Sequence, residues 1–297
     1  MTNRTALLII NPRSRRGAEA APEVFAALTE AGFGLITVPA GLPVDEAIRR
    51  HAANVDLVVV GGGDGTLNGA VSPLMETRLP LGVIPLGTGN DFARTLEIPL
   101  DPAAAAQVIA EGHTKQVDVG DVNGHPFLNA ASIGFGVDLT RALTGDTKRR
   151  WGALGYAMAG ARVLGRVRPF TVWIEHGGDV EVARTVHLAI GNGRHYGGGM
   201  VVSEQARLDD GKLHAFSLEV DHWWRLLRLL PALRNGTHQA WAEVRSFAGP
   251  ELTIRTRRPR SVNTDGEITT RTPAHFHVHA GALTVFVPRS SPETGAD

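Results

Sequence analysis

The feature that most constrains the fold is a glycine-rich loop that directly follows a short apolar run. The run Asp56–Val60 is rich in β-branched residues and predicts a buried strand, and it continues without a break into the loop Gly61–Thr66. A pattern compatible with a helix follows at once. Glycines let backbone N–H groups approach an anion closely, and the first turn of a helix adds partial positive charge. The segment predicts a phosphate-type site, with a tight glycine-rich turn as the alternative.

Asp64 is the unexpected residue in this loop, because its charge would repel a phosphate. The repulsion becomes attraction where Mg²⁺ lies between the carboxylate and the phosphate. The spacing is not G-x-G-x-x-G, and no Gly-Lys-Ser or Gly-Lys-Thr follows. The loop therefore indicates a magnesium-dependent phosphate site that is neither a dinucleotide fingerprint nor a P-loop.

The first part of the chain alternates short apolar runs with helical patterns, which is typical of a parallel sheet covered on both faces. The predicted strands are Ala6–Ile10, Leu35–Val38, Asp56–Val60 and Leu81–Ile84, and the predicted helices cover about Ala18–Ala31 and Val44–Ala53. Ligands of such sheets bind beyond the carboxyl ends of the strands, where the connecting loops gather.

After about Val122 the pattern changes to many short strands, which indicates a second, β-rich domain. The strands are Phe170–Ile174, Val186–Ile190, Leu213–Leu218, Leu252–Arg257, His275–Val278 and Leu283–Val287, with helices over roughly Ala153–Leu164 and His222–Arg234. We therefore expect an α/β domain over residues 1–122 and a β domain over 123–297, whose last residues are able to pack back on the first domain.

Two further loops follow predicted strands of the first domain. Gly87–Arg94 offers the Thr88 hydroxyl and, in Asn90 or Asp91, a cap for a helix that begins at Phe92. The other loop, Asn11–Gly17, places an amide, a hydroxyl and three arginines after the first strand. The same edge of the sheet is thus expected to carry three polar loops.

Together these motifs resemble a known family. Asn11-Pro12 with Ser14 and Gly17, then Gly62–Thr66, Gly87–Arg94 and Asp265–Glu267 are similar, in order and spacing, to the catalytic domain of diacylglycerol kinases and related bacterial lipid kinases. NAD kinases share the Gly62–Thr66 element, whereas Gly87–Arg94 is more specific to the lipid kinases. The resemblance covers nearly the whole chain. It implies a nucleotide-binding α/β domain followed by a β-sandwich domain for the lipid acceptor, with the active site in the cleft between them.

The resemblance also implies roles for particular residues, with ATP and Mg²⁺ as cofactors. The nucleotide would be held by Asn11, Gly62, Gly63, Asp64, Gly65, Thr66, Asn68, Thr88 and Asn90. Asp64 would engage the catalytic Mg²⁺ through water, and Asp118 would help that magnesium network. Asp265 and Glu267 would supply the general base. Glu267 is the leading candidate with Asp265 as its partner, and the reverse order stays open.

A structural metal site is also implied, in which the Asp210 carboxylate joins the backbone carbonyls of Arg207 and Lys212. A plain Asp-Asp-Gly turn is the alternative. The alternation His275–His279 places three histidines on one strand face, opposite Phe276 and Val278. We favour an exposed face over zinc binding, because the sequence places no carboxylate beside the histidines.

The helix His222–Arg234 combines tryptophans and leucines with arginines. This composition suits a membrane interface, and it equally suits a helix packed on the second domain with its arginines in water.

Composition limits the partners and the compartment. Lys and Arg number 30, as do Asp and Glu, so the totals do not indicate a nucleic-acid partner. The chain has no cysteine, which excludes disulfides and thiolate metal sites and suits a reducing compartment. No uncharged apolar stretch approaches the roughly 20 residues of a membrane-spanning helix. We expect a cytoplasmic protein, peripheral at the inner membrane face where its lipid substrate lies, with a homodimer left open.

The sequence thus predicts an ATP-dependent lipid kinase that transfers the γ-phosphoryl group to a hydroxyl of diacylglycerol or a related lipid. One alternative is an NAD kinase-like enzyme that phosphorylates a small molecule. The other is a catalytically silent, lipid-binding regulatory protein with the same fold.

Overall fold

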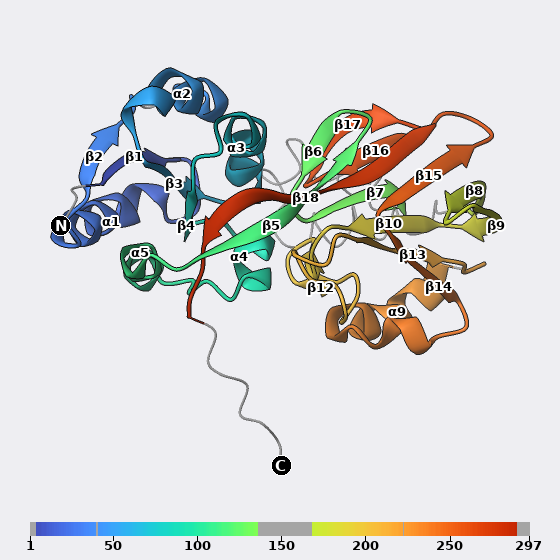
Figure 1. Cartoon of the computed structure of the whole chain (residues 1–297). Helices are drawn as coiled ribbons and strands as arrows, with labels where there is room; N and C mark the ends of the chain where they lie inside the picture. Colours follow the sequence, from blue (N-terminus) through green and yellow to red (C-terminus); the bar gives the residue numbers. More distant parts are fainter. Residues whose placement is uncertain (1–3, 40, 136–167, 222, 290–297) are drawn as a thin grey trace, which may run out of the picture. The chain divides into compact units, whose positions relative to one another are not determined.

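The structure, a computed structural model, describes residues 4–39, 41–135, 168–221 and 223–289 (Figure 1). It forms two compact units. Unit 1 comprises Met1–Val117 and Gly281–Asp297, and unit 2 comprises Asp118–Ala280. The predicted helix Ala153–Leu164 lies outside the described residues. The division into domains at residue 122 stays a prediction.

Unit 1 is built on a parallel sheet with the strand order β2-β1-β3-β4. The strands are β1 (Thr5–Ile10), β2 (Gly34–Thr37), β3 (Leu57–Gly62) and β4 (Leu81–Pro85). Every residue of β3 and β4 is buried, as a sheet covered on both faces requires. The end of the long strand β18 (Ala274–Phe286) joins the same sheet, because Val285 pairs with Leu81 in parallel.

Helices cover both faces of this sheet, with α2 and α3 on one side and α1 and α5 on the other (Figure 1). The helices are α1 (Gly17–Glu30), α2 (Val44–His51), α3 (Asp64–Thr77), α4 (Asp91–Thr95) and α5 (Pro102–Glu111), with a 3-10 turn at Ala52–Asn54. Helix α1 buries Ala20, Val24 and Leu28, which recur every four residues along one face. The predicted α/β fold of the first part is confirmed.

Unit 2 is a β-sandwich. One sheet has the order β14-β13-β10-β7-β16-β17, and the other includes β9, β8, β15 and the start of β18, with the hairpin β5–β6 paired to β18. The bounds are β5 (Thr114–Val122), β6 (His125–Phe127), β7 (Ala130–Gly134), β8 (Phe170–His176), β9 (Asp179–Thr185), β10 (His187–Gly191), β11 (His195–Tyr196), β12 (Met200–Val201), β13 (Leu213–Leu218), β14 (Val244–Gly249), β15 (Glu251–Thr256), β16 (Ser261–Thr264) and β17 (Glu267–Arg271). The pairings of the first sheet are antiparallel. The predicted β-sandwich is confirmed.

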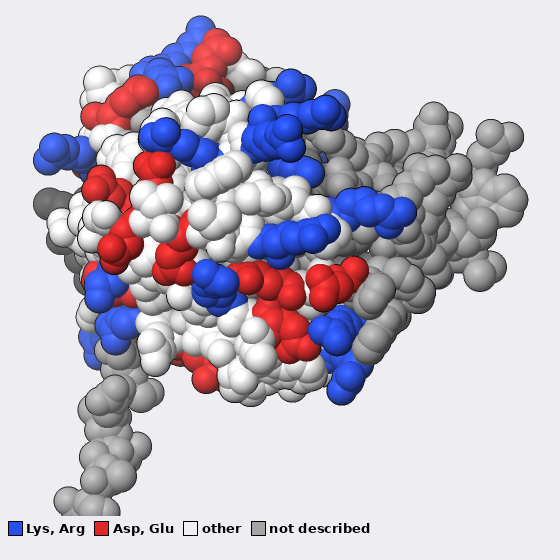
Figure 2. Space-filling model, turned by 90° about the vertical axis from the view of Figure 1, so that its right-hand side faces the viewer, with Lys and Arg blue, Asp and Glu red and all other residues white. Residues whose placement is uncertain are grey.

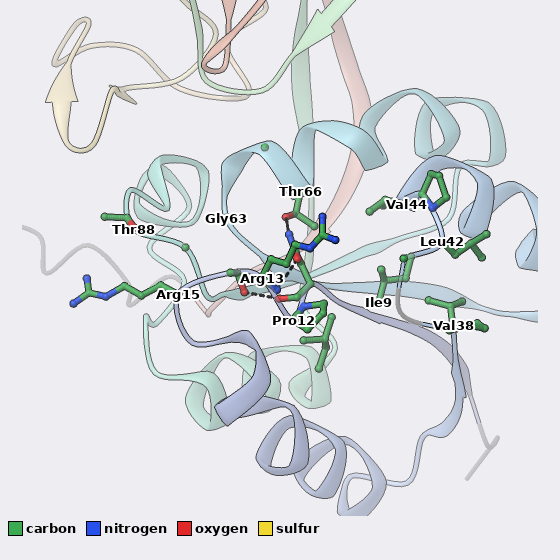
Figure 3. A pocket seen from close by; sticks show the side chains of 18 residues that line it. Ile9, Pro12, Arg13, Arg15, Val38, Leu42, Val44, Gly63, Thr66 and Thr88 are labelled. Carbon is green, nitrogen blue, oxygen red and sulfur yellow. Dashed lines mark hydrogen bonds between the residues drawn. The ribbon is translucent and has the colours of Figure 1, made fainter. Parts of the chain in front are cut away.

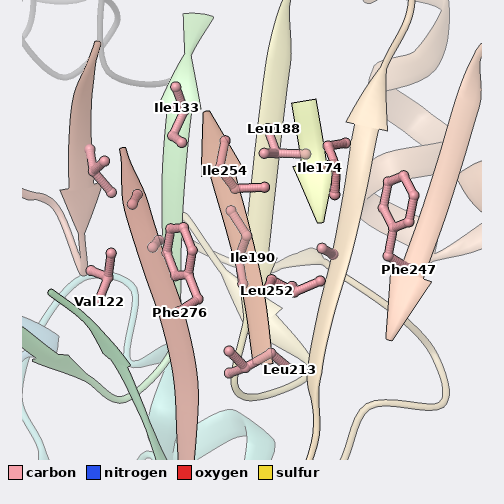
Figure 4. Close-up of a cluster of buried hydrophobic side chains, with 14 of the residues drawn as sticks. Val122, Ile133, Ile174, Leu188, Ile190, Leu213, Phe247, Leu252, Ile254 and Phe276 are labelled. Atoms are coloured by element: carbon pink, nitrogen blue, oxygen red, sulfur yellow. The ribbon is translucent and has the colours of Figure 1, made fainter. Parts of the chain in front are cut away.

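The sandwich core is formed by apolar side chains that alternate along strands of both sheets (Figure 4). Ile133 and Leu188 come from one sheet, and Ile254 and Phe276 come from the other. Phe276 is buried and Val278 packs partly against this core, so the predicted core face of that strand is confirmed.

Helix α9 (Trp223–Asn235) covers the other face of the six-stranded sheet. Its buried residues Leu229 and Leu233 belong to a cluster with Phe216 and Val244, which supports a helix packed on the domain. A 3-10 turn, Thr237–Ala240, follows it. Among the described residues, no helix combines the length and the apolar character that crossing a bilayer requires.

One predicted boundary was wrong. His275–Val278 and Leu283–Val287 were expected to be two strands, and they are parts of the single strand β18. The buried apolar positions change from even numbers, as at Phe276, to odd numbers, as at Val285, and Gly281 lies between them with a φ of 59°. A local irregularity at this glycine lets the strand continue while its buried face changes.

Acidic and basic side chains lie next to one another on the face shown in Figure 2. In unit 2, Arg245 of β14 bridges Glu181 of β9, a strand of the other sheet, and Glu219, which directly follows β13, each at 2.8 Å. These pairs are half-buried. In these pairs, opposite charges lie side by side rather than in separate patches.

We predict that unit 2 loses stability in weak acid through His187, which is buried in β10. Burial lowers the pKa of His187 from 6.5 to about 4. Between these values the unfolded chain binds a proton that the folded chain excludes, so stability is complete above pH 6.5 and falls as the pH drops towards 4. The expected loss is about 2 to 3 kcal/mol between neutral pH and the lower limit.

All five tryptophans fall within unit 2, so urea unfolding followed by tryptophan fluorescence reports on this unit. The variant His187→Gln should lose less of its unfolding free energy on acidification than the wild type. Equal losses in the two proteins would contradict the assignment to His187.

Candidate active site

Three loops of unit 1 converge where strands β1, β3 and β4 end. The Asn11 amide donates to the Gly61 carbonyl at 2.8 Å, and the Leu86 amide donates to the Gly62 carbonyl at 2.8 Å. The Arg16 amide reaches the Leu86 carbonyl at 3.3 Å, so the first loop is also attached to the end of β4. The expectation that three loops share one edge is therefore met by direct backbone bonds.

The loops after β3 and β4 touch through two glycines. A Cβ on Gly87 would lie 2.5 Å from the Gly63 Cα, a distance that no real side chain tolerates. Asn90 shapes the loop after β4 from within. Its Oδ1 accepts the Gly87 amide at 2.9 Å, and its Nδ2 donates to the Gly87 carbonyl at 3.1 Å. Asn90 precedes α4 but makes no side-chain capping bond, so its side chain organises the loop instead.

The first loop is organised by Asn11. Its Nδ2 donates to the Thr66 hydroxyl at 3.0 Å, and its Oδ1 accepts the Arg13 amide at 2.9 Å. The Ser14 hydroxyl donates to the Asn11 carbonyl at 2.7 Å. A Cβ on Gly17 would lie 2.0 Å from the same carbonyl oxygen, so only glycine fits there.

Asp64 joins the loop after β3 to the loop after β4. It is half-buried at the first position of α3, and its Oδ1 accepts the Phe92 amide at 3.2 Å. Asn68 follows one turn later, and its buried Oδ1 has no hydrogen-bond partner among the described residues. The Arg94 side chain is exposed, and its Nε donates to the Gly89 carbonyl at 2.9 Å.

A cavity of about 740 Å³ opens at these loops (Figure 3). One end is polar and includes Asn11, Gly63, Thr66 and Thr88, together with Arg13 and Arg15. The other end is apolar, with Ile9, Val38, Leu42 and Val44, as Figure 3 shows. Its size lies within the usual range for small-ligand sites.

The two carboxylates of the Asp265–Glu267 turn have different environments in unit 2. Asp265 and Gly266 form a two-residue hairpin turn between β16 and β17, with φ values of 47° and 97°. Asp265 accepts three backbone N–H bonds, from Leu128 at 2.7 Å, Asn129 at 3.0 Å and Ala130 at 3.1 Å. Glu267 is exposed at the start of β17. Asp265 therefore anchors the turn, and Glu267 faces solvent.

Asp118 and the Asp210 turn lie together in unit 2. The buried Asp118 carboxylate accepts the Gly211 amide at 2.7 Å. Asp210 accepts the Arg207 amide at 3.3 Å and the Lys212 amide at 2.9 Å, and His214 Nε2 lies 2.8 Å from its Oδ2. The structure thus brings Arg207, Asp210 and Lys212 together through N–H donors. His214 was missed from the sequence, although its position four residues after Asp210 was visible. The structural metal site stays a prediction.

Comparison with known proteins agrees with this geometry. Residues 5–122 match the family model described as the diacylglycerol kinase catalytic domain, and residues 131–287 match the YegS C-terminal NAD kinase beta sandwich-like domain. A diacylglycerol kinase from Mycobacterium tuberculosis is 34% identical, over 95% of this chain and 94% of that protein. A Pseudomonas aeruginosa protein named "Probable lipid kinase YegS-like" is 36% identical, over 84% of this chain and 81% of its own length.

A solved structure shows the same fold. The crystal structure of a diacylglycerol kinase from Bacillus anthracis has a TM-score of 0.75 and 25% sequence identity, and the match covers 97% of this chain and 98% of that one. The fold and the glycine loops define a kinase with an α/β unit and a β-sandwich unit. The chain belongs to the diacylglycerol kinase family of lipid kinases, as the motifs predicted.

We predict that Gly87→Ala destabilises unit 1, because the new methyl group would overlap the Gly63 backbone and force the two loops apart. The expected cost is about 1 to 3 kcal/mol, which is typical of overpacking in a closely packed site. Chemical unfolding followed by circular dichroism measures it. Gly69→Ala is the matched control, since a Cβ at that exposed position of α3 would have nothing nearer than 3.8 Å. Equal stability of Gly87→Ala and the wild type would contradict the close contact.

Proposed function

We propose that this lipid kinase transfers the γ-phosphoryl group of ATP to a hydroxyl of diacylglycerol or a related lipid. The cavity of unit 1 carries the proposal, because it joins a glycine-lined polar end to an apolar end. A nucleoside triphosphate has the same two halves, a polyanion and a flat, largely apolar base.

The polar end suits phosphates for a steric and an electrostatic reason. Gly65 lines the cavity, and a Cβ there would meet nothing within 4 Å. Internal packing therefore does not require this glycine, whereas a phosphate resting on the backbone would. The start of helix α3 adds partial positive charge at the same place, and Arg13 and Arg15 line the cavity with full positive charges.

The apolar end suits the base. Val38, Leu42 and Val44 offer aliphatic surface, so burying a ring against them is favourable without a specific polar partner. Specificity for adenine over other bases would then depend on backbone groups near these residues.

Asp64 is the residue we propose for the magnesium site. It supplies a carboxylate oxygen next to the phosphate end, which is the ligand type that Mg²⁺ prefers, and the amide of Phe92 orients it. When bound, Mg²⁺ neutralises negative charge on the phosphates of the nucleotide. Asp118 is hydrogen-bonded to the Gly211 amide within unit 2, and its part in the magnesium network stays a prediction.

Glu267 is the group we propose as the general base. The reaction needs a carboxylate that accepts the proton of the lipid hydroxyl while the oxygen attacks phosphorus. Asp265 already accepts three backbone N–H bonds, so its carboxylate oxygens are engaged in holding the hairpin turn. Glu267 is exposed and two residues away, so Asp265 would position it through the hairpin turn. An active site in the cleft between the domains stays a prediction.

A lipid acceptor implies catalysis at a membrane surface, so we propose a peripheral protein that meets the membrane without spanning it. The cytoplasmic inner face is where ATP is available to such an enzyme. The chemistry of the hydroxyl is shared by diacylglycerol, sphingoid bases, ceramide and phosphatidylglycerol, and the test below therefore uses several lipids.

Gly65→Ala should weaken nucleotide binding without a loss of stability. The added methyl group projects into the space assigned to a phosphate, so the dissociation constant for ATP with Mg²⁺ should rise at least roughly tenfold, equal to about 1.4 kcal/mol. Alanine is a better helix former than glycine, so the protein should unfold no more easily. Isothermal titration calorimetry measures the binding, and Gly69→Ala, on the same helix, should bind as the wild type does. Unchanged affinity in Gly65→Ala would place the phosphates elsewhere.

The activity itself is tested by phosphoryl transfer from radiolabelled ATP to a panel of lipids in mixed micelles, with NAD in a parallel reaction. We expect a labelled lipid and no labelled NAD. Asp64→Asn retains an oxygen for the Phe92 amide but removes the charge, and its rate should fall by on the order of 100-fold or more. Glu267→Gln should lower kcat by about 100- to 10,000-fold with little change in the affinity for ATP.

Two results would contradict the proposal. Labelled NAD would indicate the alternative small-molecule kinase. Lipid binding without any transfer, in a protein that binds ATP normally, would indicate a silent regulatory protein. A Glu267→Gln variant with full activity would remove Glu267 from the mechanism while leaving the nucleotide site intact.

A further inference from the structure

Two histidines and an aspartate form a cluster in unit 2 that the kinase reaction does not use. Asp121, His277 and His279 each offer one ligand atom, and these three atoms lie within 4.8 Å of one another. The Nε2 atoms of His277 and His279 are 3.1 Å apart, and His277 Nδ1 is 3.7 Å from Asp121 Oδ1. The rings meet nearly edge to face, with an interplanar angle of 74°.

The pairing of two strands creates this cluster. The Asn123 amide donates to the His275 carbonyl at 3.1 Å, and the His275 amide donates back to Asn123 Oδ1 at 2.9 Å. Two residues further into each strand, Asp121 of β5 comes next to His277 of β18. His279 follows two positions later on the same strand face. The sequence placed no carboxylate beside these histidines, and the structure supplies one from a strand more than 150 residues away in the chain, which removes the reason for favouring a plain exposed face.

The three groups differ in exposure in a way that suits a surface metal site. Asp121 is only 4% exposed, and its Oδ1 accepts the Gly124 amide at 2.8 Å, which fixes the carboxylate. The His277 side chain is 48% exposed, which leaves an approach from solvent. The hydrogen bond from the Gly124 amide orients the Asp121 carboxylate beside the two imidazoles, as hydrogen bonds to ligating carboxylates do in metal sites.

We propose that Asp121, His277 and His279 bind one divalent transition-metal ion of the Zn²⁺ type. Two imidazole nitrogens and one carboxylate oxygen are a common ligand set for Zn²⁺, with water at the remaining position. Mg²⁺ and Ca²⁺ prefer an all-oxygen set, so this site is chemically distinct from the one proposed at Asp64. Glu251 pairs with His277 in the register of β15 and β18 and adds a carboxylate on the neighbouring strand.

The position of the site gives it a structural consequence. The chain passes from unit 1 to unit 2 within β5, after Val117, and it returns to unit 1 within β18, after Ala280. An ion held by both strands would cross-link them in the native state. Because the unfolded chain lacks the preformed site, the ion would stabilise the native protein in proportion to its occupancy.

Zinc titration of the metal-free, tag-free full chain tests the proposal, with isothermal titration calorimetry and the visible spectrum of Co²⁺ as a substitute ion. We expect about one Zn²⁺ per chain at this site, the stoichiometry of a single three-ligand centre. His277→Asn and His279→Asn should each weaken that binding at least roughly tenfold, the lower end of what loss of a supporting partner costs in metal sites. Without metal, both variants should unfold in urea as the wild type does when tryptophan fluorescence is followed, which shows that unit 2 is folded.

His275→Asn is the matched control, because His275 lies on the same strand face but bonds to the Thr253 hydroxyl at 3.1 Å, outside the cluster. It should bind Zn²⁺ as the wild type does. The proposal is overturned if the wild type shows no zinc binding, or if binding persists in the double variant of His277 and His279. Loss of binding in His214→Asn alone would likewise overturn it, because the ion would then belong to the Asp210 turn.

Discussion

The contact between Gly63 and Gly87 is the constraint on which the proposed nucleotide site depends. A Cβ on Gly87 would lie 2.5 Å from the Gly63 Cα, and a Cβ on Gly63 would make a tight contact of 3.1 Å with the Gly87 Cα, so this backbone approach depends above all on the glycine at position 87. This approach lets the Asp64 carboxylate reach the Phe92 amide, and Thr66 of the same loop as Asp64 bonds to Asn11 in the loop after β1. Each loop thereby limits the conformations of the other two, so the backbone of the proposed phosphate site is organised before a ligand arrives.

Much of unit 1 was predictable because the residue types in each segment favour the same structure that the whole sheet requires. The β-branched run before Gly61 is buried throughout, and glycine and asparagine stand where the backbone needs them. The loops were placed on one edge by the rule for parallel sheets alone. The sequence could not show that the Asn90 side chain bonds to the Gly87 backbone. An asparagine is equally suited to cap a helix and to form hydrogen bonds within a loop.

Unit 2 was less predictable because its important contacts join distant segments. Asp265 and Glu267 read alike in the sequence, yet the Asp265 carboxylate is bound to the amides of 128–130, more than 130 residues earlier. Asp121 and the histidines of β18 are separated further still. Strand pairing determines such neighbours, and periodicity within one segment carries no information about which distant strand lies beside it.

The central claim is that the glycine-lined ends of three strands bind the phosphates of ATP. Backbone amide NMR of the full chain during titration with Mg²⁺ and a non-hydrolysable ATP analogue tests it most directly. The amide signals of Gly63, Gly65 and Gly87 should shift together and saturate at one ligand concentration, while those of the hairpin glycines Gly177 and Gly178 stay in place. Saturating shifts elsewhere in the chain, with these three amides unchanged, would contradict it.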